Sequence, residues 1–259
     1  MIPKVREWLE KQGYSLEMRA ASAFRKAGLE VRQSSYYIDP ETAKPREMDV
    51  EAISTSFLGY VDIRFFVECK SGDKPWVLLC SPDTLRNYNR FFAFCAMSRR
   101  CREVLTEEDL GSGLIHRYPW LSTYDVIAAY SLRQAFSSEL DSAYAAAMNV
   151  IKACHYHVAA QYTPPSHLHF AFPVIVVDTP LIRCTLGANG EIELQEVEQG
   201  ELLFRGHKLG TCIRIVTLSH LSAFASEAKQ VAEQLREELR GEEEKMIATM
   251  EQATKQHGG

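Results

Sequence analysis

Two short stretches decide the fold of this 259-residue chain: "PREMDVEAI" at residues 45–53 and "FFVECKSG" at residues 65–72. Both have the composition of buried β-strands, yet four charged side chains stand among their apolar residues: Asp49, Glu51, Glu68 and Lys70. Residues two apart on a strand point to the same face of the sheet. A buried carboxylate is costly unless it is paired, hydrogen-bonded or bound to a metal. The pattern therefore predicts a polar sheet face that needs a compensating partner.

The sequence around these stretches predicts a helix followed by three strands. Residues 15–27 place apolar side chains at helical spacing, with Ser15 suited to the N-cap and Gly28 to the position after the helix. Strands are then expected at 29–38, 46–54 and 61–72. The third strand alternates between an apolar face and a mostly charged face, so we expect its apolar face to lie in the core.

The remaining sequence predicts further helices and strands in the same domain. Ser81 followed by Pro82 favours the start of a helix over 81–105, which gives the order α-β-β-β-α. A loop and a long amphipathic helix are expected next, and then more strands. We expect one α/β domain at 1–220. Its parts are a motif core at 15–104, a helical insertion at about 125–162 and additional strands at 170–218, and a charged C-terminal helix follows at 221–259.

Composition indicates a globular protein. Hydrophobic residues make up 46% of the chain, which is enough to fill a substantial core. The N-terminal sequence is charged where a signal peptide would be apolar, and no aliphatic run is long enough to cross a bilayer. The seven cysteines include no CxxC pattern, which fits free thiols in a reducing compartment. We expect a soluble cytoplasmic protein that does not contact a membrane.

The charges are unevenly distributed. The net charge is −5, and the segment from Leu221 onward accounts for −3 of it, with eight Glu against five Lys or Arg. By contrast, residues 86–102 contain arginines and no acidic residue. A local basic face can therefore exist on an acidic protein. Either this face is solvated, or it contacts nucleic-acid phosphates through Arg86, Arg90, Arg99 and Arg100.

The charged residues on the two central strands suit a divalent cation. Mg²⁺ prefers carboxylate and carbonyl oxygens and brings a phosphate group into its coordination shell. A lysine beside such an ion can orient, or help to deprotonate, a water molecule that attacks phosphorus. The residue types therefore point to Mg²⁺ or Mn²⁺ as the cofactor and to phosphoryl chemistry.

The same residues resemble a known motif. A helix glutamate, a strand aspartate and a Glu-x-Lys tripeptide on the next strand follow one another here: Glu17, Asp49 and Glu68-Cys69-Lys70. This order is similar to that of the PD-(D/E)xK nuclease superfamily, which has the restriction-endonuclease-like fold. The resemblance implies that Asp49, Glu68 and the Cys69 carbonyl hold the metal. It further implies that Lys70 serves the attacking water and that Glu17 completes the catalytic site.

Two nearby residues have no fixed role in this resemblance. Glu51 is a further ligand, a partner of Lys70 or Arg46 beside the ligands, or a solvated residue. The resemblance covers about residues 15–104, and it implies cleavage of phosphodiester bonds, most readily in DNA. Because the chain has no visible separate recognition domain, targeting would come from loops, a homodimer or a partner protein. A role in defence or repair is what the resemblance to other members of the superfamily implies.

Two other hypotheses stay open. One is a catalytically inactive module of the same fold that binds nucleic acid or assembles with other proteins. The other is an unrelated α/β protein whose charged strand residues form plain salt bridges. No Walker A loop, GxSxG elbow or GxGxxG fingerprint follows a strand, which disfavours the usual NTPase, hydrolase and dinucleotide-binding classes.

Two histidine pairs suggest zinc by residue type: His155 with His157, and His167 with His169. The first pair lies on an expected helix, where residues two apart point about 200° away from each other around the axis. These two imidazoles cannot easily share an ion. We therefore expect a structural role for the histidines, with His167 and His169 near the nucleic acid.

Overall fold

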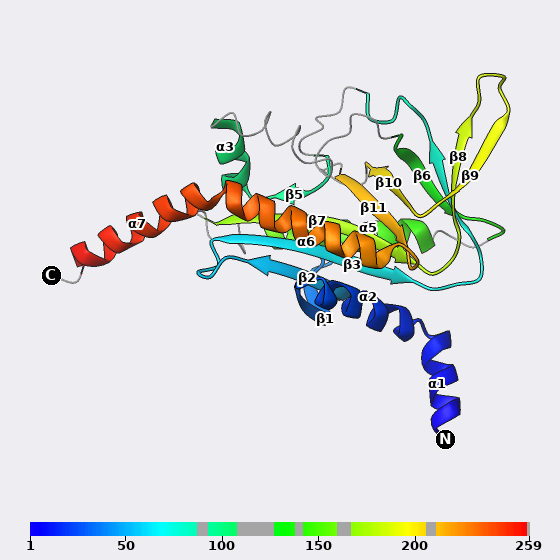
Figure 1. Ribbon diagram of the computed structural model, residues 1–259, viewed down its shortest axis with the longest axis horizontal. Helices are drawn as coiled ribbons and strands as arrows, with labels where there is room; N and C mark the ends of the chain where they lie inside the picture. Colours follow the sequence, from blue (N-terminus) through cyan, green and yellow to red (C-terminus); the bar gives the residue numbers. More distant parts are fainter. Residues whose placement is uncertain (87–92, 108–126, 138–141, 160–166, 206–210, 258–259) are drawn as a thin grey trace.

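The structure, a computed structural model, describes residues 1–86, 93–107, 127–137, 142–159, 167–205 and 211–257. Its helices are α1 (Ile2–Lys11), α2 (Tyr14–Lys26), α3 (Arg99–Glu107), α5 (Ser142–Val158), α6 (Leu221–Glu238) and α7 (Arg240–His257). The first strands are β1 (Glu30–Ile38), β2 (Pro45–Thr55), β3 (Val61–Lys70), β4 (Trp76–Cys80), β5 (Ala96–Met97) and β6 (Ala129–Gln134). The later strands are β7 (Leu168–Val177), β8 (Leu181–Leu186), β9 (Ile192–Val197), β10 (Gln199–Phe204) and β11 (Thr211–Thr217). Helices α1 and α7 project from opposite ends of the body (Figure 1).

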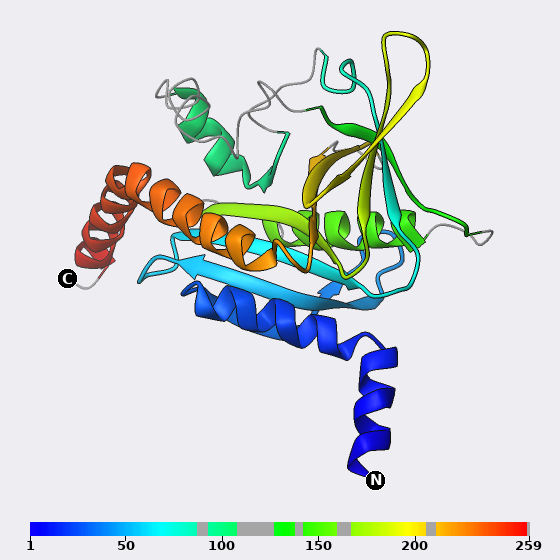
Figure 2. The ribbon, with the colours of Figure 1, turned by 45° about the vertical axis from the view of Figure 1, so that its right-hand side comes forward.

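The strands form one mixed sheet in the order β1-β2-β3-β7-β11-β10-β6-β4-β8-β9, with β5 paired to β7. Strands β1, β2 and β3 are antiparallel, whereas β7 runs parallel to β3 and β11 runs parallel to β7. Strands β10 and β6 are joined by a single residue pair, Leu202 with Ala129. The β8–β9 hairpin stands away from the rest of the sheet (Figure 2). The chain is therefore an α/β protein, and the charged strand β3 lies inside its sheet.

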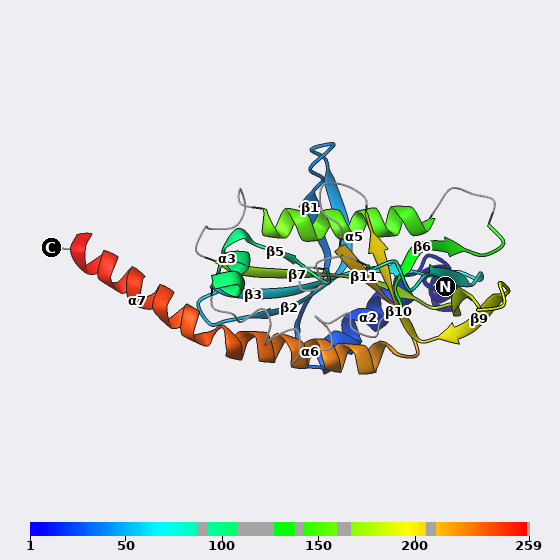
Figure 3. The ribbon, with the colours of Figure 1, turned by 90° about the horizontal axis from the view of Figure 1, so that it is seen from above.

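Helices cover both faces of this sheet. Helices α2 and α6 pack on one face and α5 packs on the other (Figure 3). The alternation expected on β3 is confirmed, because Ile63, Phe65 and Val67 lie in the core beneath α2 and α6. Phe66 lies in the core beneath α5. The charged face of β3 therefore points toward α5.

The predicted elements hold best at the start of the chain. The helix expected at 15–27 and the three strands after it are observed as α2, β1, β2 and β3. Helix α1 was not expected. The C-terminal segment forms two helices, α6 and α7, rather than one.

The helix predicted over 81–105 is wrong. In the described part of this segment, residues 82–86 form turns, Ala96–Met97 form strand β5, and only the last part is helical, in α3. Strand β5 is held by pairing of Ala96 with Ala171 on β7, a contact that local helical spacing does not reveal. The order after β3 is therefore β4, β5 and α3 instead of one long helix.

The helical insertion expected at about 125–162 is shorter than predicted and contains a strand. Residues Ala129–Gln134 form β6, and the helix begins only at Ser142. The loop expected at 106–124 lies largely outside the described residues. Helix α5 packs on β3 and β7, the two parallel strands on either side of it in the sequence. It is therefore part of the core that supports β3.

No helix in the described part of the chain is long and apolar enough to cross a membrane.

Candidate active site

Strands β2 and β3 diverge next to Asp49. Their last residue pair is Val50 with Val67. Beyond it, the backbone N–H of Cys69 donates a hydrogen bond to Oδ2 of Asp49 over 2.7 Å. A side-chain carboxylate thus takes the place of a backbone acceptor. This bond fixes Asp49 beside the strand that carries Glu68 and Lys70.

The alternation of β2 is also broken at Asp49. Met48 and Val50 are two residues apart, yet Met48 packs in the core beneath α5 and Val50 in the core beneath α2 and α6. On the paired strand β1, Ser34 has a positive φ of 52°, which is uncommon for a residue with a side chain. Local irregularity in a strand turns a side chain away from its regular direction. Asp49 lies at this irregularity.

Both carboxylate oxygens of Glu68 are held by neighbours. Lys70 Nζ lies 2.7 Å from Oε1, and Asn149 Nδ2 on α5 donates to Oε2 over 3.0 Å. The hydroxyl of Tyr37 on β1 donates in turn to Oδ1 of Asn149 over 2.8 Å. Asn149 and Tyr37 are supporting residues that the sequence pattern missed. Asn149 contacts Glu68 directly, and Tyr37 acts on it through Asn149. Together the two residues fix the orientation of Glu68, which is only 4% exposed.

Glu17 joins the group from the first turn of α2. Burial, together with the negative charges of Glu47 and Glu68, raises its pKa above the ordinary value. The start of α2 is close to the end of β3, because a Cβ placed on Gly13 would lie 3.5 Å from Oγ of Ser71. Gly13 has φ of +85°, a conformation that favours glycine. The structure therefore brings Glu17 toward the carboxylates of the strands.

The electrostatics of the group favour a cation. Burial, followed by the charge of Glu68, raises the pKa of Asp49 to about 7, against the lowering effect of the Cys69 N–H. Burial acts to lower the pKa of Lys70, and the Glu68 carboxylate outweighs it, so this pKa is raised. Three carboxylates, Asp49, Glu68 and Glu17, thus face one ammonium group. A divalent cation would offset the excess negative charge.

The donor set fits Mg²⁺ or Mn²⁺. Asp49 and Glu68 supply carboxylate oxygens, which are hard ligands. The N–H and C=O of one strand residue point to the same side of the strand. Since the N–H of Cys69 points to Asp49, its carbonyl is directed to the same side. The side chain of Cys69 packs against the core beneath α2 and α6, and burial raises the pKa of its thiol, so the backbone is its contribution to the site.

Glu51 and Arg46 do not take the places considered for them beside Lys70. Glu51 is only 6% exposed, so it is not a solvated residue, and its Oε1 accepts a hydrogen bond from Arg64 over 3.2 Å. Arg46 Nε lies 3.8 Å from Oδ2 of Asp39 near the β1–β2 turn. For Glu51, the hypothesis of a plain buried salt bridge describes the structure best.

Two of the arginines expected to contact phosphates, Arg99 and Arg100 on α3, lie apart from this group. Helix α3 starts at Arg99, and Ser98 just before it donates its N–H to the carbonyl of His169. His169 pairs with Asp62, at the opposite end of β3 from Lys70. Carboxylates engage the arginines: Arg86 pairs with Asp83, Arg99 with Glu103, and Arg100 with Glu103 and Glu242. Arg90 lies outside the described residues.

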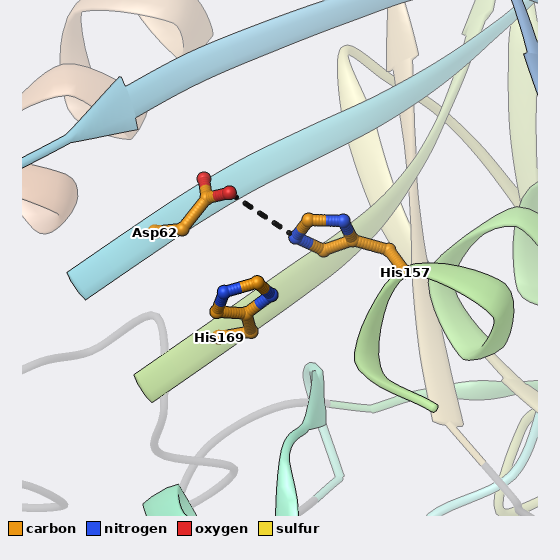
Figure 4. Close-up of side chains that lie close together, drawn as sticks. All are labelled: Asp62, His157 and His169. Atoms are coloured by element: carbon orange, nitrogen blue, oxygen red, sulfur yellow. Dashed lines mark ion pairs between the residues drawn. The ribbon is translucent and has the colours of Figure 1, made fainter. Parts of the chain in front are cut away.

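A second polar cluster lies at that opposite end of β3. It contains Asp62 from β3, His157 from α5 and His169 from β7 (Figure 4). Burial, with the charge of Arg64 second, lowers the pKa of His157 to about 2, and burial also lowers that of His169. Among the described residues, this is the group whose three His or Asp ligand atoms all lie within 4.8 Å of one another. Each histidine pair of the sequence contributes one member, a combination the sequence did not suggest.

A comparison with protein-family models gave no match, and comparisons with curated proteins and with solved structures gave no significant match.

Proposed function

We propose that this protein is a metal-dependent nuclease with a restriction-endonuclease-like core, hydrolysing phosphodiester bonds, most readily in DNA. One observation carries the proposal. Where β2 and β3 diverge, the Asp49 carboxylate is tied to the Cys69 backbone, between Glu68 and Lys70 on the same strand. This is the order and the arrangement of residues that the sequence resemblance implies. A helix carrying Glu17 precedes the strands, and β7 lies parallel to β3 beneath α5, which also fits such a core.

The residues of the group have distinct tasks in this mechanism. Asp49, Glu68 and the Cys69 carbonyl hold Mg²⁺ or Mn²⁺, whose chemistry is to polarise the scissile phosphate and to make water a better nucleophile. Lys70, which its raised pKa keeps as an ammonium, would donate a hydrogen bond that orients the attacking water once its contact with Glu68 loosens. Glu17 adds negative charge at the margin of the site and orients bound water.

The supporting contacts fit a site that must be held in place. Asn149 and Tyr37 position Glu68 from the side of α5 and β1. Hydrogen-bonded partners of metal-ligating carboxylates fix their orientation and raise the affinity for the metal. We assign Asn149 and Tyr37 as positioning residues, since they act through Glu68.

The direct experiment is a cleavage assay with the full chain. Supercoiled plasmid and end-labelled linear DNA are incubated with Mg²⁺, with Mn²⁺ and with excess EDTA. We expect nicking or cleavage that depends on the metal and is lost in Asp49→Ala and Lys70→Ala. Asp73→Asn is a matched control, because Asp73 is an exposed carboxylate three residues beyond Lys70. Cleavage that persists in both site variants, with unchanged thermal stability, contradicts the assignment.

A catalytically inactive module is the second candidate. The observation that favours it is the tight engagement of Glu68, whose two oxygens are already occupied by Lys70 and Asn149. In this case DNA or a partner protein would bind without turnover and without dependence on metal. An electrophoretic mobility assay with Mg²⁺ or EDTA, run beside the cleavage assay, separates the two candidates.

A further inference from the structure

The cluster of Asp62, His157 and His169 is separate from the proposed nuclease site. Asp62 and Glu68 are six residues apart on β3, which corresponds to about 20 Å along an extended strand. The cluster is also deeply placed: Asp62 is 4% exposed, His169 is 8% exposed, and the side chain of His157 is 11% exposed. It joins β3 to two elements from much later in the sequence, α5 and β7 (Figure 4). The cluster is therefore too far from the proposed nuclease site to take part in it, and its function follows from its own residues.

The geometry of the cluster is close to that of a metal site. His157 Nε2 lies 3.6 Å from Oδ2 of Asp62. Two ligands on a tetrahedral zinc ion, with bonds of about 2.0–2.2 Å, are about 3.4 Å apart. The His169 ring stacks on the His157 ring with centroids 4.8 Å apart. One ligand atom from each of Asp62, His157 and His169 lies within 4.8 Å of the other two.

Arg64 links Asp62 of the cluster to a second carboxylate, that of Glu51. Arg64 Nη2 lies 2.7 Å from Oδ2 of Asp62, and Arg64 Nη1 lies 3.2 Å from Oε1 of Glu51. Two carboxylates thus share one guanidinium, and these three groups together carry a net charge of −1. A carboxylate has about four lone-pair positions, so Asp62 can accept from Arg64 and still bind an ion. Hydrogen bonds of this kind orient carboxylate ligands in metal sites.

A cavity lies beside the cluster. A cavity of about 200 Å³ is lined by His157, Arg64 and Glu51, with Tyr36 and Tyr156 on its other walls. Tyr36 is 67% exposed, so this cavity lies near the surface. The cavity therefore lies between the surface and His157, one of the three residues of the cluster.

We propose that Asp62, His157 and His169 form a second metal site, which binds Zn²⁺. Imidazole nitrogens suit zinc and other first-row transition metals, whereas Mg²⁺ prefers an all-oxygen set. Three protein ligands and one water complete a four-coordinate ion. The ion ties the end of α5 to β3 and β7. Because α5 also carries Asn149, the ion stabilises the helix that positions Glu68.

The test is zinc binding by the full-length protein. Zn²⁺ alone is titrated calorimetrically into metal-free protein, and the content of purified protein is measured by mass spectrometry. We expect one high-affinity Zn²⁺ per chain and weakening by about 100-fold in His157→Gln and in His169→Gln. His155→Gln is the matched control, because His155 lies on the same helix but not in the cluster, and it keeps wild-type affinity. Equal affinity in all four proteins overturns the proposal, as does an absence of stoichiometric Zn²⁺ binding by the wild type.

Two further measurements keep the proposal testable if a histidine variant does not fold, which circular dichroism will show. Co²⁺ bound to the wild type should give the absorption of a nitrogen and oxygen site, whereas a thiolate charge-transfer band would place the ion on cysteines and overturn the proposal. Asp49→Asn should retain the zinc. Loss of zinc in that variant would place the ion at the other site. DNA cleavage enters none of these readouts, so the zinc site and the nuclease activity can fail independently.

Discussion

Asn149 Nδ2 on helix α5 donates a hydrogen bond over 3.0 Å to Oε2 of Glu68, a residue that lies 81 positions earlier in the chain. Lys70 holds the other oxygen of the same carboxylate. Glu68 therefore has one orientation, set jointly by its own strand and by a helix that crosses the sheet face. The proposed metal site depends on this helix as well as on the two strands that carry the motif.

Replacing Asn149 should weaken metal binding without unfolding the protein. We expect Asn149→Ala to lower the affinity for Mn²⁺ by about 10- to 100-fold, because partners of this kind fix the ligand orientation. Tyr37→Phe should have a smaller effect in the same direction, since its hydroxyl reaches Glu68 only through Asn149. Mn²⁺ titration followed by electron paramagnetic resonance measures both. If Tyr37→Phe still weakens binding in the Asn149→Ala background, the two residues do not act through one chain of hydrogen bonds.

Lys70 should be needed for turnover and not for metal binding. Lys70→Ala removes the group that serves the attacking water, and we expect a loss of about 10²- to 10⁴-fold in the single-turnover cleavage rate. The Mn²⁺ affinity should stay the same or rise, because the change removes a positive charge beside Glu68. A variant that loses metal and activity together would show that Lys70 acts on the carboxylates and not on the water.

The pKa of Asp49 predicts a pH dependence of stability. Burial and the charge of Glu68 raise this pKa to about 7 in the folded protein, above the ordinary value that applies in the unfolded chain. Between these two values the folded state holds a proton that the unfolded state has lost, so the free energy of unfolding falls as pH rises through this window. Above about pH 7 this contribution no longer changes. A divalent cation binds the ionised form, so its stabilising effect should be larger at about pH 8 than at about pH 5.

Asp49→Asn tests this electrostatic cost. The amide oxygen can still accept the Cys69 N–H, while the negative charge is gone. We expect the metal-free variant to be more stable than the wild type near pH 8 by roughly 2 kcal/mol. This figure is the raised pKa of Asp49 expressed as a free energy and discounted for solvent screening. Differential scanning calorimetry across the pH range, with and without Mn²⁺, gives the comparison. Equal pH profiles for the two proteins would mean that the charge of Asp49 does not destabilise the folded protein.

Glu51 should matter for stability and not for the chemistry. It is buried in an ion pair with Arg64, so Glu51→Ala leaves a partly buried guanidinium short of one partner and should cost about 3 kcal/mol. Glu30→Ala breaks the exposed pair with Arg32 and should cost under about 1 kcal/mol, which makes it the matched control. Urea unfolding measures both. The cleavage rate per folded molecule should stay the same in Glu51→Ala. A fall by orders of magnitude would show that Glu51 takes part in catalysis.

The sequence was most informative where local pattern and tertiary structure agree. The alternation of β3 predicted which side chains face the core. The pair spacing predicted that Asp49 lies near Glu68, and the structure ties Asp49 to the backbone of the next residue, Cys69. The hydrogen bond from Asn149 to Glu68 could not be predicted from the sequence, because a partner 81 residues away leaves no local pattern. The apolar segment around Ala96 fits helical spacing, but pairing with β7 makes it a strand. The cluster with Asp62 takes one residue from each histidine pair, a combination that spacing within a pair does not reveal.

The measurement that tests the central claim most directly is anomalous diffraction from crystals of the full-length protein soaked in Mn²⁺. The account predicts an anomalous peak between the carboxylates of Asp49 and Glu68, within bonding distance of the Cys69 carbonyl, that disappears in Asp49→Asn. A fully soaked crystal with an ordered Asp49 and Glu68 and no peak between them would contradict it.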